Sequence, residues 1–207
     1  MTVRIYDSYG NTRGGEFIAI PSGFDFTAAS LGETDGFETF CLERNEWIWP
    51  GRPYEVEISK AAIRGGYDGG SPDPLDPMTA YLYHHFITRS LANYDYENTG
   101  VGRANIDDAL QYAIWYIEDE ITTLPSTLST VFYNDAYDAV YVSQRWEGTG
   151  NVYVMNLYRT NWRGHKYNRQ DQLVMIIPAP NALLLSAIGI ALIGWLRKNI
   201  VPIGDKK

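Results

Sequence analysis

Hydrophobic and polar residues alternate in short runs toward both ends of the chain, and this period of two predicts β-strands. The runs are rich in aromatic and β-branched residues and are bounded by Gly, Pro, Ser or Asp, which favour turns. Strands are predicted over residues 3–6, 16–20, 37–44, 54–58, 139–142, 152–158 and 173–177. Short strands of this kind are typical of an antiparallel sheet.

Two segments in the middle of the chain carry helix signals instead. Asp76 before Pro77 predicts an N-cap with proline at the first helical position, for a helix over residues 77–91. Asn105, with Asp107 and Asp108 in the first turn, predicts a second helix over residues 106–121. The fold class is therefore expected to be α+β: an antiparallel sheet or sandwich with a two-helix insertion.

An uncharged stretch near the C-terminus changes the domain picture. Residues 182–196 are apolar except for one serine and two glycines, and Arg197 and Lys198 follow them. About 15 residues is short for a membrane span, which usually takes about 20. The alternative, a buried core helix, would normally be amphipathic and would not end in a basic pair. We expect an extracellular domain at residues 1–176 and a short hydrophobic anchor helix within residues 177–207.

Composition and charge narrow the class of partner. The 207-residue chain has 16 Tyr, 6 Trp and 7 Phe, as a folded module does, and a formal net charge of −8. Nucleic-acid binding needs a basic face, so the acidic balance argues against it. Residues 1–10 lack the basic start and apolar core of a signal peptide, so we expect that an export leader is missing from this sequence.

Cys41 is the only cysteine, which excludes an intramolecular disulfide. A lone thiol in an exported protein calls for a chemical explanation. A Cys-His-Asp hydrolase using Cys41 and His84 or His85 is one alternative, although no nucleophile motif surrounds the cysteine. The two histidines are adjacent and point in different directions on a helix, so we expect no metal site, no cofactor and no enzyme activity.

The acidic loop that contains Asp68, Asp73 and Asp76 is a second alternative site, for calcium. Its prolines and the missing EF-hand spacing favour a solvated turn instead. The glycine pair Gly14-Gly15 lacks a strand-to-helix phosphate motif and is interpreted as a turn.

The segments GFETFCLERNE (residues 36–46) and LQYAIWYIEDE (residues 110–120) resemble the thioester-domain family, which is also called TQXA. In that family a strand cysteine bonds to the glutamine of a helix with the pattern TQxAIW. Gln111 and Trp115 match that pattern together with Ala113 and Ile114, whereas Leu110 replaces the usual Thr. The resemblance implies a thioester between Cys41 and Gln111.

A thioester must be protected from water, and aromatic residues surround both segments. We expect Phe40, Trp47, Tyr112 and Trp115 to contribute to a pocket that slows hydrolysis and admits a chosen amine. The alternative is that these aromatics belong to an ordinary core. By helical spacing, Gln111 lies about 100° from the centre of the apolar stripe and flanks the buried face.

The C-terminal segment IPAPNALLLSAIGIALIGWLRK, residues 177–198, resembles the PEP-CTERM sorting signal. Pro178, Ala179 and Pro180 stand where that family has Pro-Glu-Pro, and Arg197 and Lys198 form the basic cluster that follows the hydrophobic helix. The resemblance implies processing by an exosortase-type enzyme and attachment to the membrane through the C-terminal helix. The chain continues nine residues beyond the basic pair, further than is usual for that signal.

These features together predict an exported bacterial protein that is membrane-anchored or released to the cell surface or matrix. Its expected role is adhesion or matrix linking, through a Cys41–Gln111 thioester that bonds covalently to an amine-bearing partner. The alternative is a non-reactive structural protein of the envelope or exopolysaccharide matrix, in which Cys41 remains a free buried thiol.

Overall fold

The computed structural model describes residues 1–10, 14–32, 34–65 and 70–178. The chain divides into two compact units, Met1–Ile177 and Pro178–Lys207. Of the second unit only Pro178, which is exposed, lies among the described residues. The predicted anchor helix and the sorting-signal residues Ala179, Pro180, Arg197 and Lys198 lie outside them. Within the described residues, no helix has the length and apolar character needed to span a bilayer.

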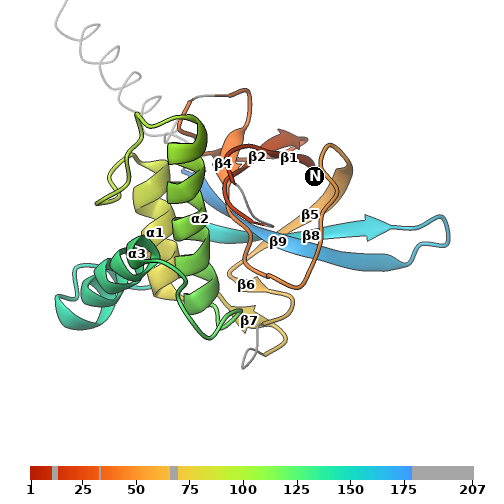
Figure 1. The fold of residues 1–207 in the computed structure, drawn as a ribbon. Helices are drawn as coiled ribbons and strands as arrows, with labels where there is room; N and C mark the ends of the chain where they lie inside the picture. Colours follow the sequence, from red (N-terminus) through yellow and green to blue (C-terminus); the bar gives the residue numbers. More distant parts are fainter. Residues whose placement is uncertain (11–13, 33, 66–69, 179–207) are drawn as a thin grey trace, which may run out of the picture. The chain divides into compact units, whose positions relative to one another are not determined.

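An antiparallel sheet forms the larger part of the first unit, and it curls until it is nearly a barrel (Figure 1). Seven strands of the described chain pair in the order β3-β9-β8-β5-β1-β2-β4. Their bounds are β1 Thr2–Asp7, β2 Phe17–Ser22, β3 Thr27–Ala28, β4 Phe37–Thr39, β5 Pro53–Ser59, β8 Val152–Thr160 and β9 Lys166–Ile177. A separate two-stranded ribbon pairs β6 Ala61–Ala62 with β7 Asp73–Pro74.

The sheet closes where the chain leaves its edge strand β4. Leu42 N–H donates to the Asp171 carbonyl at 2.9 Å, and Leu173 N–H donates to the Phe40 carbonyl at 3.0 Å. These two bonds place Cys41 opposite Gln172 of β9 in an isolated antiparallel bridge. Only residues 37–39 of the predicted strand 37–44 are therefore regular strand, and Cys41 lies at the seam of the sheet.

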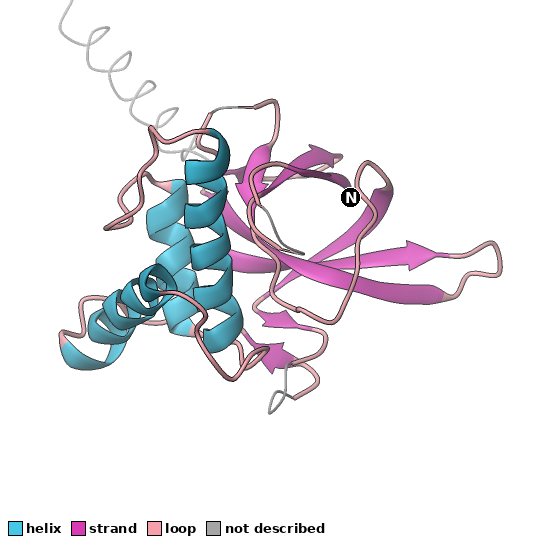
Figure 2. Cartoon of the chain, viewed as in Figure 1, coloured by secondary structure: helices cyan, strands magenta, loops and turns pink. Residues whose placement is uncertain are grey.

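Helices α1 Pro77–Ile87, α2 Gly100–Ile117 and α3 Thr127–Tyr137 gather on one side of the sheet (Figure 2). The predicted cap of α1 is confirmed, because Asp76 accepts a hydrogen bond from Met78 N–H at 2.7 Å. Helix α2 begins earlier than predicted, after Thr99, so Asn105, Asp107 and Asp108 lie inside the helix and do not cap it. The two-helix insertion thus gains a third helix among the described residues.

The predicted strand over residues 139–142 is wrong. These residues form a π-helical turn, Asp138–Val142, that continues directly from α3. Ser126 caps α3, and Phe132, Ala136 and Ala139 bury one side of the helix and its continuation. Spacing along a helix therefore outweighs the β-branched and aromatic composition of this segment.

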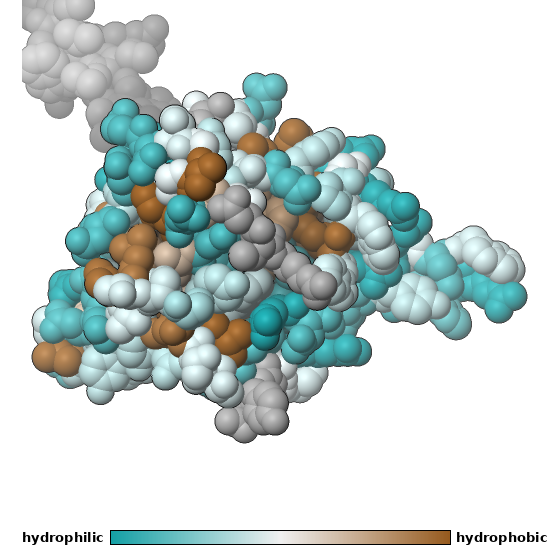
Figure 3. Space-filling view, viewed as in Figure 1, coloured by the Kyte–Doolittle hydropathy of each residue, from teal (hydrophilic) through white to brown (hydrophobic). Residues whose placement is uncertain are grey.

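Two hydrophobic clusters occupy the two faces of the curled sheet. One lies between the helices and the sheet and includes Phe40, Phe86 and Leu173. The other draws on strands around the curl and includes Cys41, Trp115 and Val174; we call it the inner cluster. On the face shown in Figure 3, hydrophobic side chains form scattered patches among hydrophilic ones, as is normal for a protein surface.

Candidate functional site

Cys41 is fully buried and faces the inner cluster. Its backbone forms a non-hydrogen-bonded antiparallel pair with Gln172, because the two flanking bonds run through residues 42 and 171 and residues 40 and 173. Neighbours along a strand alternate between faces, so Phe40 and Leu42 turn to the helix-side cluster while Cys41 turns inward.

Gln111 approaches Cys41 from helix α2. It belongs to a stripe of residues four apart on one side of that helix, namely Arg103, Asp107, Gln111 and Trp115, and all four are buried. Gln111 was expected at the margin of the buried face, but in the structure its side chain is completely inaccessible to solvent. Around Gln111 and Trp115 this stripe is covered by the segment that precedes β2, and the helix also packs on α1 and α3.

The structure brings Cys41 and Gln111 into direct contact across 70 residues of sequence. Cys41 Sγ lies 3.1 Å from Gln111 Oε1, and the backbone N–H of Cys41 donates to the same oxygen at 3.1 Å. Gly15 N–H also donates to Oε1, at 3.4 Å, while Gln111 Nε2 donates to the Cys41 carbonyl at 2.8 Å. The amide is thus held at both ends, and its oxygen is polarised by two backbone donors beside the sulfur.

Gly14 and Gly15 form a cover over this contact. A β-carbon on Gly14 would lie 2.5 Å from Trp115 Cη2 and 2.7 Å from Gln111 Cγ, so only glycine fits. Gly15 has a φ of +108°, which also favours glycine. The sequence interpretation of this pair as a plain turn missed its role, and nothing in the local sequence distinguishes the two.

A buried ion network fastens the glycine cover to α2. Arg103 Nη2 donates to Glu16 Oε2 at 2.6 Å, and Arg103 Nε donates to Asp107 Oδ2 at 3.2 Å. Tyr94 donates its hydroxyl proton to the other oxygen of Asp107. Burial raises the pKa of Glu16 and raises that of Asp107 to about 8, against the opposing charge of Arg103. Because Glu16 directly follows Gly15, this network fixes the cover above Gln111.

The electrostatic surroundings keep the Cys41 thiol protonated. Burial raises the pKa of Cys41 well above its usual range, and Glu43, once it is ionised, raises it further. The backbone N–H of Cys41 and the indole of Trp115 act in the opposite direction. Trp115 Nε1–H acts on the sulfur as a hydrogen-bond donor and has no other partner among the described residues.

Two buried carboxyl groups, Glu43 and Asp171, lie near the seam. Glu43 Oε2 accepts the Asp171 backbone N–H at 2.6 Å, and the Asp171 carboxylate accepts the N–H groups of Ile63 and Leu157. Burial raises the pKa of Glu43 to about 10 and that of Asp171 to about 7. The pair therefore retains a proton at neutral pH.

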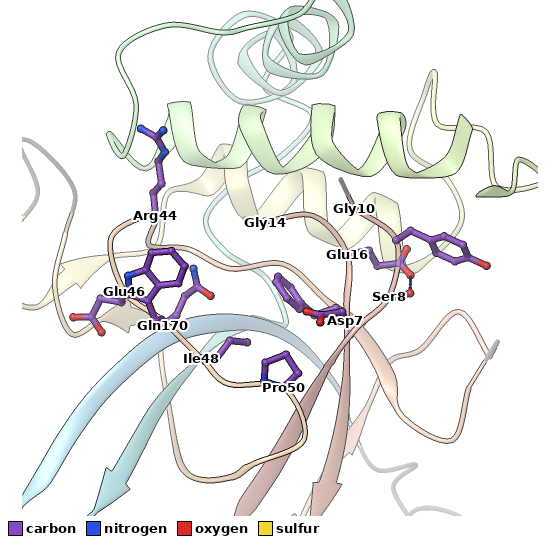
Figure 4. A pocket seen from close by; sticks show the side chains of 13 residues that line it. Asp7, Ser8, Gly10, Gly14, Glu16, Arg44, Glu46, Ile48, Pro50 and Gln170 are labelled. Atoms are coloured by element: carbon purple, nitrogen blue, oxygen red, sulfur yellow. Dashed lines mark hydrogen bonds between the residues drawn. The ribbon is translucent and has the colours of Figure 1, made fainter. Parts of the chain in front are cut away.

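A surface pocket of about 440 Å³ lies on the outer side of the glycine cover (Figure 4). Gly14 forms part of its wall, with Asp7, Glu46 and Trp47 around it and Gln170 from β9. Cys41 and Gln111 do not line the pocket, so Gly14 separates it from the Cys41–Gln111 contact. A molecule bound in the pocket would therefore be separated from Gln111 only by Gly14.

The four aromatic residues expected to surround the site lie in different places. Phe40 packs edge-on against Phe86 in the helix-side cluster, with ring centroids 5.0 Å apart. Trp47 is 53% exposed in the pocket wall. Tyr112 is half-buried and meets the Trp115 ring edge-on at 5.7 Å. Of the four, Trp115 is the one that packs with Cys41 in the inner cluster.

The histidines have other neighbours. His85 Nδ1 shares a hydrogen bond with Ser90 Oγ at 2.7 Å, and the His84 ring packs on Trp146 with centroids 4.9 Å apart. Across the described part of the chain, no group of three or more His, Cys, Asp or Glu residues is arranged to hold a metal ion.

Comparison with protein-family models, curated proteins and solved structures finds no match to this chain. Functional argument therefore starts from the buried Cys41–Gln111 contact, its glycine cover and the adjoining pocket.

Proposed function

We propose that Cys41 and Gln111 form an internal thioester, and that the chain is an exported, surface-anchored adhesion or matrix-linking protein which bonds covalently to amines. The observation that carries the proposal is the 3.1 Å contact between Cys41 Sγ and Gln111 Oε1, in a buried site with two backbone donors on that oxygen. Cys41 is the only cysteine, and among the described residues no group of metal ligands includes it, so neither a disulfide nor a metal site in that part of the chain accounts for this contact.

Formation of the bond needs no outside reagent. The Cys41 sulfur attacks the side-chain carbonyl carbon of Gln111, and the negative charge that develops on Oε1 is stabilised by the N–H groups of Cys41 and Gly15. The carbon–nitrogen bond then breaks, and the thiol proton leaves with the nitrogen as ammonia. The products are the Cys41–Gln111 thioester and one ammonia.

Burial disfavours a charged sulfur at this position but is compatible with a thioester. A thiolate is expensive in this apolar site, as the raised pKa of Cys41 indicates, whereas a thioester carries no charge. The complete burial of both side chains also keeps water from the reactive carbonyl. A stored electrophile of this kind survives until an amine reaches it.

The pocket beside Gly14 supplies a route for that amine. Its wall contains the carboxylates of Asp7 and Glu46 and the exposed ring of Trp47, which suit a lysine side chain, and the cation of Arg44 lies on the same wall. The acidic balance of the chain, with a net charge of −8, also attracts a basic partner surface. The reaction joins the amine to the Gln111 carbonyl and returns Cys41 as a thiol.

Anchoring belongs to the same proposal and rests on the sequence of residues 177–198. We infer that the protein is exported and that an exosortase-type enzyme recognises Pro178-Ala179-Pro180 and processes the chain there. Before processing, the hydrophobic run that is followed by Arg197 and Lys198 attaches the chain to the membrane.

Methylamine labelling tests the chemistry. The proposal predicts that the native protein takes up one methylamine at Gln111, and that C41A and Q111E take up none. A matched control is Q144E, a change of the same type at an exposed glutamine, which retains the labelling. Equal labelling of C41A and the unaltered chain would contradict the proposal. Absence of any adduct, with one free thiol per chain after unfolding, would favour the alternative of a non-reactive structural protein.

A further inference from the structure

Gln172 is a second glutamine amide next to Cys41, and its partners are missing. The residue is completely buried, yet neither Oε1 nor Nε2 has a hydrogen-bond partner among the described residues. A buried amide without partners costs free energy, and such groups in native proteins usually have a functional reason or bind a small polar guest. In contrast, both ends of the Gln111 amide in the same site are hydrogen-bonded.

The sheet register directs the Gln172 side chain to the Cys41 face. Residues opposite each other in a non-hydrogen-bonded antiparallel pair point to the same side, with Cβ atoms about 4.5–5.5 Å apart. Leu173 belongs to the helix-side cluster, and Val174 belongs to the inner cluster with Cys41. Gln172 therefore shares the inner face with the sulfur.

Trp115 adds a donor to this face. Its ring packs in the inner cluster with Cys41, and its buried Nε1–H interacts with the sulfur and has no other hydrogen-bond partner among the described residues. The face that carries the sulfur therefore also carries one acceptor and two kinds of donor: Gln172 Oε1, Gln172 Nε2–H and Trp115 Nε1–H.

We propose that Gln172, assisted by Trp115, is the amine-binding residue of the thioester reaction. This inference rests on the proposed function and identifies which side chains hold the reacting nitrogen. Gln172 Oε1 accepts one N–H of a neutral primary amine and orients the nitrogen lone pair toward the Gln111 carbonyl carbon. Ammonia lost during formation of the thioester passes through the same position, because the two reactions are reversals of one another with different amines.

The step balances without a further reagent. The amine nitrogen bonds to the Gln111 carbonyl carbon, the carbon–sulfur bond breaks, and Cys41 Sγ takes the proton that the nitrogen loses. The N–H groups of Gln172 and Trp115 stabilise the sulfur while it carries negative charge. A primary amine has a second N–H to keep on Gln172 Oε1 during this transfer, whereas a secondary amine has only one. The site therefore selects primary amines, such as a lysine side chain.

Two variants separate this role from a structural one. Q172M has nearly the same shape and removes both unpaired atoms, so the protein is expected to fold with unchanged or higher thermal stability. Q172E retains an acceptor oxygen. N156L is the control for the loss of a buried amide away from Cys41. Asn156 lies on the other face of β8 and donates to Ser59 Oγ at 2.8 Å and to the Ala61 carbonyl at 3.3 Å, so its replacement lowers stability without touching the reacting groups.

The experiment measures the rate of adduct formation with methylamine and with dimethylamine on the full chain, by intact mass. We expect Q172M to react with methylamine about tenfold more slowly, as for one lost transition-state hydrogen bond, and to discriminate less against dimethylamine. Q172E is expected to recover part of the rate, and N156L to match the unaltered chain. A folded Q172M that contains no thioester would also support the inference, because ammonia uses the same position.

Equal rates and equal discrimination in Q172M and the unaltered chain would overturn the assignment of Gln172 while leaving the thioester itself in place. Failure of the unaltered chain to form any adduct would instead contradict the proposed function. If Q172M does not fold, the Q172E rate decides. Q172E keeps the acceptor oxygen but lacks the Nε2–H donor, so the proposal predicts a slower reaction with an unchanged preference for methylamine, and a rate equal to that of the unaltered chain would overturn the assignment.

Discussion

Replacing Gly14 by alanine tests whether the glycine cover holds Gln111 in place. The added β-carbon would lie 2.5 Å and 2.8 Å from Cη2 and Cζ2 of Trp115 and 2.7 Å from Gln111 Cγ. Carbon atoms in favourable contact are about 3.5–4.0 Å apart, so the overlap is about 1 Å. Gly14 does not have a positive φ, so the perturbation is one of packing and not of backbone conformation.

The expected magnitude follows from that overlap. Overpacking a buried site costs about 1–3 kcal/mol in the free energy of unfolding. For a folded unit of this size, 1 kcal/mol lowers the midpoint of thermal unfolding by about 2–4 °C, so G14A is expected to lower it by about 2–12 °C. A shift of about 1 Å at Gln111 is also expected to slow thioester formation by about a hundredfold.

Thermal unfolding and the time course of ammonia loss, followed by intact mass, measure the two effects. G70A is the matched control, because Gly70 is exposed and the nearest atom to its added β-carbon is a Pro72 oxygen at 3.3 Å. We expect that variant to stay within about 0.5 kcal/mol of the unaltered chain. An unchanged midpoint and an unchanged rate in G14A would refute the claim that Gly14 packs on Gln111 and Trp115.

Three further outcomes follow. R103M leaves two buried carboxyl groups without their cation, so it is expected to lower the free energy of unfolding in denaturant by about 3–5 kcal/mol. R64M, at an exposed ion pair, is expected to lower it by about 0–1 kcal/mol. Equal losses in the two variants would contradict a buried network. Burial raises the pKa of Glu43 from 4.5 to about 10 and that of Asp171 from 3.8 to about 7, so the folded chain binds protons that the unfolded chain releases. The free energy of unfolding therefore falls as pH rises from about 5 to about 10. Urea titrations at about pH 6 and about pH 9 measure this fall, and E43Q is expected to make it smaller. A larger fall in E43Q would contradict the raised pKa of Glu43. Deletion of Pro178–Lys207 is expected to release the exported protein from membranes, and unchanged partition on fractionation would refute the anchor.

Local sequence signals were sufficient for much of the fold. Alternation located β1, β5 and β8, and the Asp76-Pro77 cap located the start of α1, because these features depend on neighbouring residues alone. Helix α3 was missed because its cap uses Ser126 and Ser129 in place of the usual Glu or Gln at the third position. Its continuation over Asp138–Val142 was mistaken for a strand because of its two valines and tyrosine.

The site depended on contacts that local patterns do not contain. Only a family resemblance paired Cys41 with Gln111, whereas the structure joins them through closure of the sheet at Gln172. Gln111 was placed at the margin of the apolar stripe because its cover, Gly14 and Gly15, lies almost a hundred residues away in the sequence. Charged residues are rarely expected in a core, so the Arg103 network that fastens the cover was not anticipated.

The most direct test of the account is the intact mass and thiol content of the full chain, unfolded in denaturant at neutral pH in the presence of an alkylating reagent. Unfolding is necessary because Cys41 is completely buried, so that slow labelling of the native protein would not separate a thioester from an inaccessible thiol. The account predicts a mass lower than the sequence mass by one ammonia, with no alkylation of Cys41, and one alkylated thiol after methylamine treatment. A mass equal to that of the sequence, with one alkylated cysteine per chain, would contradict it.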